Sequence, residues 1–561
     1  MTVGGIDGGG QQLGRLLPVV FVVAVIALFS ARPSSAQAQD EAFRAALAEL
    51  REASFPDKEA AIGRLVQTAH GGARQALVAL LEDRLYFRQA DGAVFIVKSA
   101  DAGAGAAFEL VDPISSSDAG TAPGEELTRI GTNNRLRRVL KTEIARFDLE
   151  NPDAAVRLDA VREMLRDLDD ASIALLRQRT GETDTQVRAE IETGLALSAL
   201  DGSDPEARLA AVATLSRRLR PEVRNRLAAL LEQSEDGTFL ERDTGVRLAA
   251  AEAVESIDRA RRFYSGIETL FFGLSLGSVL VLVAIGLAIT FGVMGVINMA
   301  HGELMMLGAY TTYVVQLWMP NHIGASVLVA IPAAFLVAGA AGVLIERTII
   351  RFLYGRPLET LLATFGLSLI LQQLVRSLFS ANNRAVESPA WMSGTLQINE
   401  ALAITFNRLY IVIFTLMVFA ILLAVLKRTR LGLDIRAVAQ NRGMAQAMGV
   451  RSEWVDAMTF GLGSGIAGVA GVALSQLTNV GPNLGQAYII DSFMVVVFGG
   501  VGNLWGTFIG GMSLGVINKL LEPYSGAVLA KIVVLVALIL FIQRRPRGLF
   551  PQTGRAAESL Q

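Results

Sequence analysis

The stretch "FGVMGVINMAHGELMMLGAY", residues 291–310, has the apolar bulk of a membrane helix, yet Asn298, His301 and Glu303 lie within it. Placing a histidine and a carboxylate in hydrocarbon is costly, so such residues usually mark a solute pathway or a structural pair. Glycines at 292, 295, 302 and 308 allow close approach of neighbouring backbones. The stretch predicts a turn between two membrane crossings, where His301 and Glu303 either hydrogen-bond nearby backbone or line a polar solute path.

The chain around this stretch has two compositional parts. Residues 40–262 are rich in Arg, Glu, Asp and Ala, whereas residues 263–542 are dominated by aliphatic residues, Gly and Phe. The mean hydropathy of +0.43 averages over both parts. A net charge of −2, with no basic stripe interleaved with aromatics, argues against a nucleic-acid partner. The absence of cysteine excludes disulfides, thiolate metal sites and cysteine nucleophiles.

Residues 1–38 are predicted to be a secretory signal peptide. Arg15 precedes an apolar run at 16–29, and Ala36 and Ala38 form a small-residue cleavage pattern. An uncleaved membrane anchor is the alternative interpretation. Either one places the residues from 40 onward on the outer side of the membrane.

A short phrase occurs four times in the polar part, beginning at Asp153, Asp184, Asp204 and Asp243, with spacings of 31, 20 and 39 residues. Each copy reads Asp, two residues, an aliphatic residue, then Arg. Asp can cap the helix that follows, and the aliphatic and Ala positions form one buried stripe. The phrase resembles HEAT-type helical repeats. Residues 39–262 are therefore expected to form an external (periplasmic) α-helical repeat domain that serves as an interaction module.

Two segments of the polar part do not follow the repeat. Residues 84–99 carry aromatic and β-branched residues on both sides of Asp91-Gly92, which predicts a β-hairpin. Residues 99–126 are of low complexity and are expected to form an exposed loop. The expected fold class is nevertheless all-α, with a polytopic membrane domain after the repeat domain.

Apolar runs of membrane length predict seven crossings. They lie at 267–290, 301–318, 325–346, 358–380, 409–426, 454–478 and 526–542. An eighth apolar region, 488–518, is interrupted by "GGVGN" and is predicted to be a broken hairpin. Arginines and lysines gather at 347–356, 427–451 and 544–547, which predicts that these segments are cytoplasmic. Residue 266 is then outside, in agreement with the signal peptide, and 263–543 form a membrane domain followed by a cytoplasmic tail, 544–561.

Three motifs in order resemble the permease subunits of branched-chain amino acid ABC importers. They are the opening stretch, "GLDIRAVAQNRGMAQAMGV" (432–450) and "FGGVGNLWGTFIGG" (498–511). The resemblance covers residues 263 to about 551. The signal peptide and the large external domain are similar to the urea importer permease of the same family. This resemblance implies a bacterial inner (plasma) membrane protein with ATP-binding subunits, a second homologous permease subunit, a periplasmic solute-binding protein and membrane lipid as partners.

By this resemblance, residues 432–450 would dock on an ATP-binding subunit through a short helix at 443–448. The candidate residues of this coupling loop are Gly432, Arg436, Asn441, Arg442, Ala445 and Gly449. Only "AQAMG" (445–449) remains of the Glu-Ala-Ala…Gly pattern of wider relatives, and some of the arginines could serve topology alone. The chain has no G-x-x-x-x-G-K-[ST] phosphate cradle, so this chain is expected to bind no cofactor and ATP to be used by partner subunits.

Uncharged polar groups within the apolar part are the candidates for a solute path, because urea needs paired donors and acceptors rather than counter-ions. The set, with the two ionisable residues of the opening stretch, is Asn298, His301, Glu303, Thr364, Gln372, Gln373, Gln476, Asn479 and Asn503. Thr364 and Gln372 are eight residues apart and share one helical face. Asn503 follows the glycines of the broken hairpin. For each residue an interhelical hydrogen bond is the alternative.

The leading hypothesis is a permease subunit of an ATP-driven importer of urea or a short-chain amide. Import of branched-chain amino acids is the alternative within transport, and a membrane receptor with an external binding domain is the alternative outside it. A membrane enzyme is disfavoured, because the three histidines form no H-E-x-x-H or other clustered arrangement.

Overall fold

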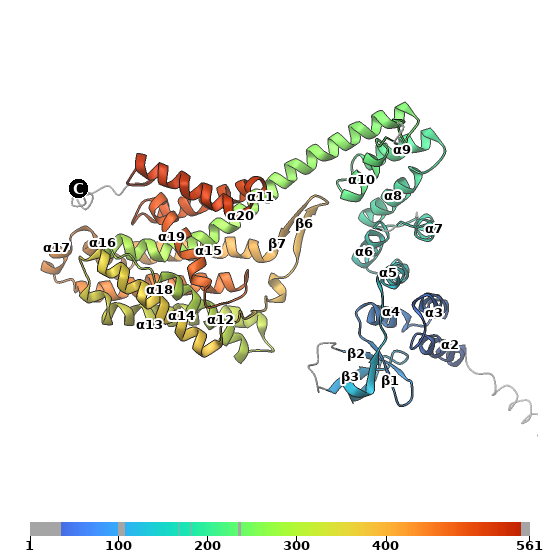
Figure 1. Cartoon of the computed structure of the whole chain (residues 1–561), viewed down its shortest axis with the longest axis horizontal. Helices are drawn as coiled ribbons and strands as arrows, with labels where there is room; N and C mark the ends of the chain where they lie inside the picture. The colour runs from blue at the N-terminus through green and yellow to red at the C-terminus, as the bar shows by residue number, and fades with distance from the viewer. Residues whose placement is uncertain (1–34, 99–106, 167, 180, 234–236, 551–561) are drawn as a thin grey trace, which may run out of the picture. The chain divides into compact units, whose positions relative to one another are not determined.

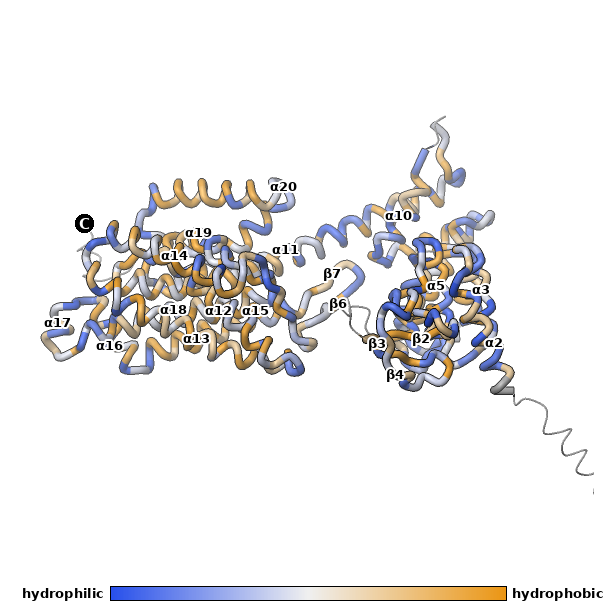
Figure 2. The backbone as a smooth tube through the Cα atoms, turned by 60° about the horizontal axis from the view of Figure 1, so that its bottom comes forward, coloured by the Kyte–Doolittle hydropathy of each residue, from blue (hydrophilic) through white to orange (hydrophobic). Residues whose placement is uncertain are grey.

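The computed structural model describes residues 35–98, 107–166, 168–179, 181–233 and 237–550. The chain divides into two compact units, Met1–Ile257 and Asp258–Gln561, each described here by itself (Figure 1). Figure 2 shows mixed polar and apolar residues in the first unit and mainly apolar residues in the second. Residues 1–34 of the predicted signal peptide lie outside the described residues, and 35–38 belong to helix α2 (Ser35–Glu49).

The first unit begins with three helices that pack around Phe43, Leu65 and Leu80. They are α2, α3 (Phe55–Gln67) and α4 (Ala73–Leu81). An antiparallel sheet of five strands follows, in the order β4-β3-β2-β1-β5. Its strands are β1 (Leu85–Arg88), β2 (Val94–Val97), β3 (Ala107–Val111), β4 (Asp118–Pro123) and β5 (Leu127–Arg129), with the short 3₁₀ helix η1 (Gly124–Glu126) before β5.

The sheet confirms one prediction and corrects two. The hairpin around Asp91-Gly92 is present as β1–β2, with Tyr86 opposite Phe95. The all-α expectation is wrong for this region, and so is the exposed loop for the described part of 99–126, which contains β3 and β4; residues 99–106 lie outside the described residues. Five of the six residues of β4 are exposed. Its place in the sheet depends on backbone pairing with β3, for which its composition carries no signal.

The rest of the first unit is helical, and the repeated phrase begins four of its helices. The helices are α5 (Asn134–Asp148), α6 (Ala154–Met164), α7 (Asp170–Gln178), α8 (Thr185–Ala199), α9 (Pro205–Leu215), α10 (Pro221–Ala229) and α11 (Thr244–Met294). Asp153, Asp184 and Asp204 are the N-caps of α6, α8 and α9. Asp243 accepts a hydrogen bond from the backbone N–H of Val246 at the start of α11. The predicted capping role of the aspartates is confirmed.

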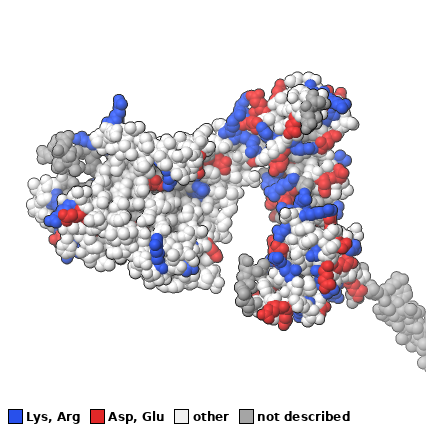
Figure 3. All heavy atoms as spheres, in the orientation of Figure 1, with Lys and Arg blue, Asp and Glu red and all other residues white. Residues whose placement is uncertain are grey.

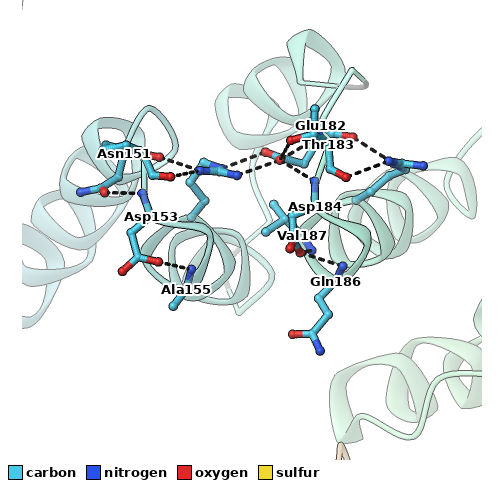
Figure 4. A network of polar contacts seen from close by, with 11 residues as sticks. Asn151, Asp153, Ala155, Glu182, Thr183, Asp184, Gln186 and Val187 are labelled. Atoms are coloured by element: carbon cyan, nitrogen blue, oxygen red, sulfur yellow. Dashed lines mark hydrogen bonds and ion pairs between the residues drawn. The ribbon is translucent and has the colours of Figure 1, made fainter.

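In the first and third copies, the arginine of the phrase joins its helix to the segment before the next copy, and Figure 4 shows the surroundings of the first of these contacts. Arg157 donates to the backbone oxygens of Asn151 and Pro152 and forms a two-pronged ion pair with Glu182, two residues before the next capping aspartate. Arg208 pairs with Glu241 in the same way. Asp153 and Asp204 are 51 residues apart, as are Arg157 and Arg208. The irregular spacing therefore resolves into two copies of a unit that carries two phrases.

The second unit is a helical bundle. Its helices after α11 are α12 (His301–Trp318), α13 (Ile323–Thr348), α14 (Pro357–Phe379), α15 (Phe406–Arg428), α16 (Arg430–Gln440), α17 (Arg442–Ala447), α18 (Ser452–Ser475), α19 (Leu484–Gly499) and α20 (Leu504–Arg544). The 3₁₀ turns η2 (Ile350–Phe352) and η3 (Ala390–Met392) and the hairpin of β6 (Thr395–Asn399) and β7 (Leu402–Thr405) connect them. Figure 3 shows few charged residues on the visible surface of this bundle.

Among the described residues, six helices are long and apolar enough to cross a membrane: α11, α13, α14, α15, α18 and α20. Six of the seven predicted crossings overlap them almost fully, and two of these extend past the helix end, 358–380 by one residue and 454–478 by three. The seventh, 301–318, is α12, a shorter and largely buried helix. The predicted break at "GGVGN" lies between α19 and α20. The last predicted crossing is the second limb of α20, because this helix continues through a kink at Gly526, whose φ is 75°.

Glycine contacts hold α12 at the centre of the bundle. A Cβ at Gly308 would lie 2.0 Å from the backbone oxygen of Gly468 in α18, and one at Gly302 would lie 2.5 Å from that of Gly485 in α19. Lipid provides no hydrophobic drive for helix association, so membrane helices depend on such close packing. The glycines of the opening stretch therefore set the distances between α12 and its neighbours.

Replacing Gly308 with Ala is expected to destabilise the membrane unit by about 1–3 kcal/mol, the usual cost of inserting a methyl group into a close-packed interior. Gly366→Ala in α14 is the control, because a Cβ there meets nothing within 4 Å. All four tryptophans lie in the second unit, so tryptophan fluorescence during thermal unfolding of the detergent-solubilised chain reports on this unit. Equal melting temperatures for the two variants would contradict the packing argument.

The Arg157–Glu182 pair predicts a specific pH dependence for the first unit. The hydrogen bond from Arg157 lowers the pKa of Glu182 from 4.5 to about 2. A lowered folded-state pKa stabilises the fold above the ordinary pKa, and this stabilisation is lost as the pH falls through the folded value. The melting temperature of Glu182→Gln, followed by circular dichroism on a fragment of residues 35–257, should fall below wild type at pH 6 and approach it near pH 2. Glu192→Gln, at an exposed position of α8, should show no such convergence.

Candidate functional site

The first break in the bundle, residues 295–300, is held by side chains from two elements. Helix α11 ends at Met294, and Gly295, with φ 66°, reverses the chain. Asn298 Oδ1 accepts from the backbone N–H of Ala300 at 3.0 Å. Thr364 of α14 accepts from the N–H of Met299 at 3.1 Å and lies 3.2 Å from the backbone oxygen of Ile297. Non-helical backbone at membrane depth needs such partners, so Thr364 stabilises the break.

His301 connects the start of α12 to α11. Its side chain is fully buried, and Nε2 lies 2.9 Å from the backbone oxygen of Val283, to which it donates. This contact is the backbone hydrogen bond that was one of the two roles considered for His301.

Glu303 is buried against α14, and one of its two carboxylate oxygens has no hydrogen-bond partner among the described residues. Oε1 accepts from Gln372 Nε2 at 2.7 Å and from Ser368 Oγ at 3.0 Å. Oε2 has no hydrogen-bond partner among the described residues, although the residue is only 1% exposed. A buried acceptor without a donor is costly, so this oxygen is an unsatisfied acceptor at the start of α12.

One face of α14 carries the partners of this site. Thr364, Ser368 and Gln372 are all buried and are spaced by four residues. The predicted shared face of Thr364 and Gln372 is confirmed. Ser368 was missed, although the i, i+4 spacing between the two predicted residues points to it.

The other sequence candidates lie apart from this cluster. Gln373 and Asn479 are exposed. Gln476 is buried, and its Oε1 has no partner within the described part of the chain. Arg376, one turn after Gln372, donates to Asn483 Oδ1 at 2.7 Å. The structure therefore brings together Asn298, His301, Glu303, Thr364 and Gln372 at the start of α12, and does not place Gln373, Asn479 or Asn503 with them.

Asn503 belongs to the second break, residues 500–503, which contacts the end of α11 and the chain's tail. Asn503 Oδ1 accepts from the N–H of Gly506 and so caps α20. A Cβ at Gly292 would lie 2.3 Å from the Cα of Gly502, so the last turn of α11, just before the first break, is in direct contact with the second break. The N–H of Leu549 donates to the oxygen of Phe498 at 2.9 Å. The tail, for which the sequence offered no contact, thus returns to the second break.

The predicted coupling loop contains α16 and α17, the latter close to the predicted helix at 443–448. Asn441 caps α17 by accepting from the N–H of Met444 at 2.9 Å. Gly432 and Ala445 are buried, Gly449 has φ 89°, and Arg436 donates to the backbone oxygen of Leu426. Met444 and Met448 are 62% and 79% exposed, so α17 presents an apolar surface beside the charged residues of the loop.

Three buried acidic residues were not singled out from the sequence. Asp456 of α18 forms an ion pair with Arg442, Glu346 of α13 accepts from Tyr354 at 3.1 Å, and Asp491 of α19 pairs with Lys531 at 3.0 Å. Isolated charges within apolar runs were the available signal. Within the described ranges, no group of three or more His, Asp or Glu side chains could hold a metal ion.

Comparison with known proteins identifies relatives of the second unit. The family model "Branched-chain amino acid transport system / permease component" matches residues 269–542. The high-affinity branched-chain amino acid transport permease LivH of Salmonella typhimurium is 32% identical over 301 residues, which are 52% of this chain and 97% of that protein. BraD of Pseudomonas aeruginosa is 31% identical over 51% of this chain and 96% of its own length. LivH of Escherichia coli is 31% identical over 52% of this chain and 97% of its own length.

Thr364→Val is expected to destabilise the membrane unit by about 1–3 kcal/mol, because it leaves a buried backbone N–H and C=O at the first break without a partner. Thr364→Ser keeps the hydroxyl and should retain most of the stability. Thermal unfolding followed by tryptophan fluorescence distinguishes the two variants. If valine and serine behave alike, Thr364 does not stabilise the break through its hydroxyl.

Proposed function

The chain belongs to the family of permease components of branched-chain amino acid transport systems, and on this premise we propose that it is the permease subunit of an ABC importer of urea or a short-chain amide. Membership makes it a multi-pass membrane transport protein and not an enzyme. The proposal concerns the orientation, the partners and the cargo.

The two ends of the bundle support an orientation with the tail in the cytoplasm. Arg347 of α13 lies 4.0 Å from Glu453 of α18, which brings the α13–α14 connection and the coupling loop to one end. Gln316 binds the backbone of Glu387, and Arg384 pairs with Val480, at the other end. The first end has the arginine-rich segments 347–356, 427–451 and 544–547. By the positive-inside rule it is cytoplasmic, so the first unit is periplasmic and the membrane is the bacterial inner membrane.

The coupling loop is proposed to dock on ATP-binding subunits. It lies at the basic end, and it exposes Met444 and Met448 on a short helix whose inner side is buried at Ala445. Exposed methionines adapt to a partner surface. Because the sequence has no phosphate cradle of its own, ATP hydrolysis has to come from separate chains. The second homologous permease subunit and the periplasmic solute-binding protein complete the proposed importer.

The surroundings of Glu303 are the basis for the proposed solute. Its free oxygen Oε2 is a strong acceptor, and the groups beside it, Ser368 and Gln372, are neutral donors or acceptors. A small neutral solute rich in N–H groups, such as urea or acetamide, satisfies this combination without requiring a counter-ion for a carboxylate.

Import of a branched-chain amino acid is the second candidate, favoured by one observation in addition to the names of the relatives. Arg376 is exposed one turn beyond Gln372, whose amide donates to Glu303. The Arg376 guanidinium and the Glu303 carboxylate are the charges that the carboxylate and ammonium groups of an amino acid would need.

For the first unit we propose an interaction role. Its two arginine–glutamate pairs join α6 to the segment before α8 and α9 to the segment before α11, which supports HEAT-like repeats that stack their neighbours. Docking of the solute-binding protein is the proposed purpose of this surface.

Uptake in cells with and without this gene tests the proposal. Labelled urea at micromolar concentration should enter in a gene-dependent way, with competition by acetamide and none by leucine. Glu303→Gln should reduce uptake about ten- to a hundredfold, as for a lost hydrogen bond to a charged group. The matched control is Glu359→Gln, at an exposed acidic residue of α14. Gene-dependent uptake of leucine and not urea would reject the cargo and leave the amino acid candidate.

A further inference from the structure

Two buried acidic residues and a partly exposed arginine lie together beside α17, the short helix of the coupling loop. Arg442, the first residue of α17, forms an ion pair with Asp456, whose side chain is fully buried. The Arg442 guanidinium also stacks over the ring of Tyr354, with 4.9 Å from Cζ to the ring centroid. Tyr354 donates its hydroxyl to Glu346 Oε1 at 3.1 Å. One arginine therefore bridges α17, α18 and the α13–α14 connection.

The bridge is costly to break. Arg442 bonds Asp456 Oδ2, and Oδ1 has no partner among the described residues, so withdrawal of Arg442 would leave a buried and uncompensated carboxylate. The planar guanidinium satisfies both the carboxylate and the ring face, which a lysine ammonium does less well. The position of Arg442 is thus tightly defined by its surroundings.

Helix α17 has few other attachments. It spans six residues, too few to be stable alone. Gln446 donates to Ser452 Oγ at 2.6 Å, and Ala445 packs with Val455 in a small apolar cluster. Its orientation therefore depends on Arg442 together with these two contacts.

The helices that hold Arg442 also enclose the helix that carries Glu303. A Cβ at Gly342 of α13 would lie 2.2 Å from Ser464 Oγ of α18, and one at Gly468 of α18 would lie 2.5 Å from the backbone oxygen of Ala334. Gly308 of α12 is in equally close contact with Gly468. Tightly packed helices of this kind move together rather than deform.

We propose that Arg442 is a positioning residue for transport: its bridge to Asp456 and Tyr354 fixes α17 so that movement of a docked ATP-binding subunit is passed to α13 and α18, and through them to α12. This inference rests on the proposed function. Arg442 contacts no solute, and its effect is on the coupling of ATP hydrolysis to import.

The test uses the purified importer complex in proteoliposomes, with ATP hydrolysis and uptake of labelled urea or leucine, whichever the wild type imports, measured on the same sample. Arg442→Gln should lower uptake per ATP hydrolysed by about tenfold, within the usual range of coupling between sites. Arg442→Lys should recover part of the loss. Arg451→Gln, at an exposed arginine that follows this loop and precedes α18, should match wild type.

A double variant separates positioning from stability. Arg442→Gln combined with Asp456→Asn leaves no uncompensated charge. Any loss of assembly or ATP hydrolysis in the single Arg442→Gln variant should therefore be restored, while uptake per ATP hydrolysed stays low. Recovery of full uptake in the double variant would overturn the proposal, as would an Arg442→Gln complex that matches the Arg451→Gln control. Absence of ATP-driven uptake in the wild type would instead reject the proposed function.

The lack of cysteine in the chain allows a direct check of the anchor. A spin label on Met448→Cys should become more mobile when Arg442 is replaced by Gln and remain unchanged when Arg451 is replaced. Unchanged label mobility in the Arg442→Gln complex would show that Arg442 does not fix α17.

Discussion

The membrane unit depends on one constraint: a helix that breaks inside a bilayer must find a partner for every backbone group that it frees. The first break uses Asn298 and Thr364 for this purpose, and the ring of His301 ties the start of α12 to the backbone oxygen of Val283 within α11. These contacts begin α12 beside α14 and α11, and the glycines of α12 then bring it against α18 and α19. The position of Glu303 follows, because it lies in the first turn of the helix that the break starts.

The same constraint explains why the second break lies where it does. Gly292 in the last turn of α11 lies against Gly502, and the tail provides further partners through Leu549 and Phe550. The second break is thus covered by the end of α11 and by the tail.

Sequence reasoning found what periodicity and residue chemistry encode locally. The capping aspartates, the β1–β2 hairpin, the shared face of Thr364 and Gln372 and the interruption before Asn503 were all predictable, because each depends on neighbours close in sequence. Strand β4 was missed because its pairing comes from backbone groups, which every residue has. The Arg442–Asp456 and Asp491–Lys531 pairs were missed because their partners are set by tertiary packing. The spacing of the repeated phrase was visible, but its pairing became clear only when Arg157 and Arg208 were seen to reach Glu182 and Glu241.

Helix α11 packs through two different kinds of contact along its length. Its first turns bury Val246, Ala250 and Ile257 at helical spacing, as in water, where removal of apolar surface drives association. Further along, Gly273 and Gly277 meet the backbone of α20 at Val516 and Met512. Lipid tails are as apolar as leucine, so apolar side chains alone no longer favour protein contact and small residues become necessary. Helix α11 therefore carries both kinds of packing, with buried aliphatic residues up to Ile257 and glycine contacts from Gly273.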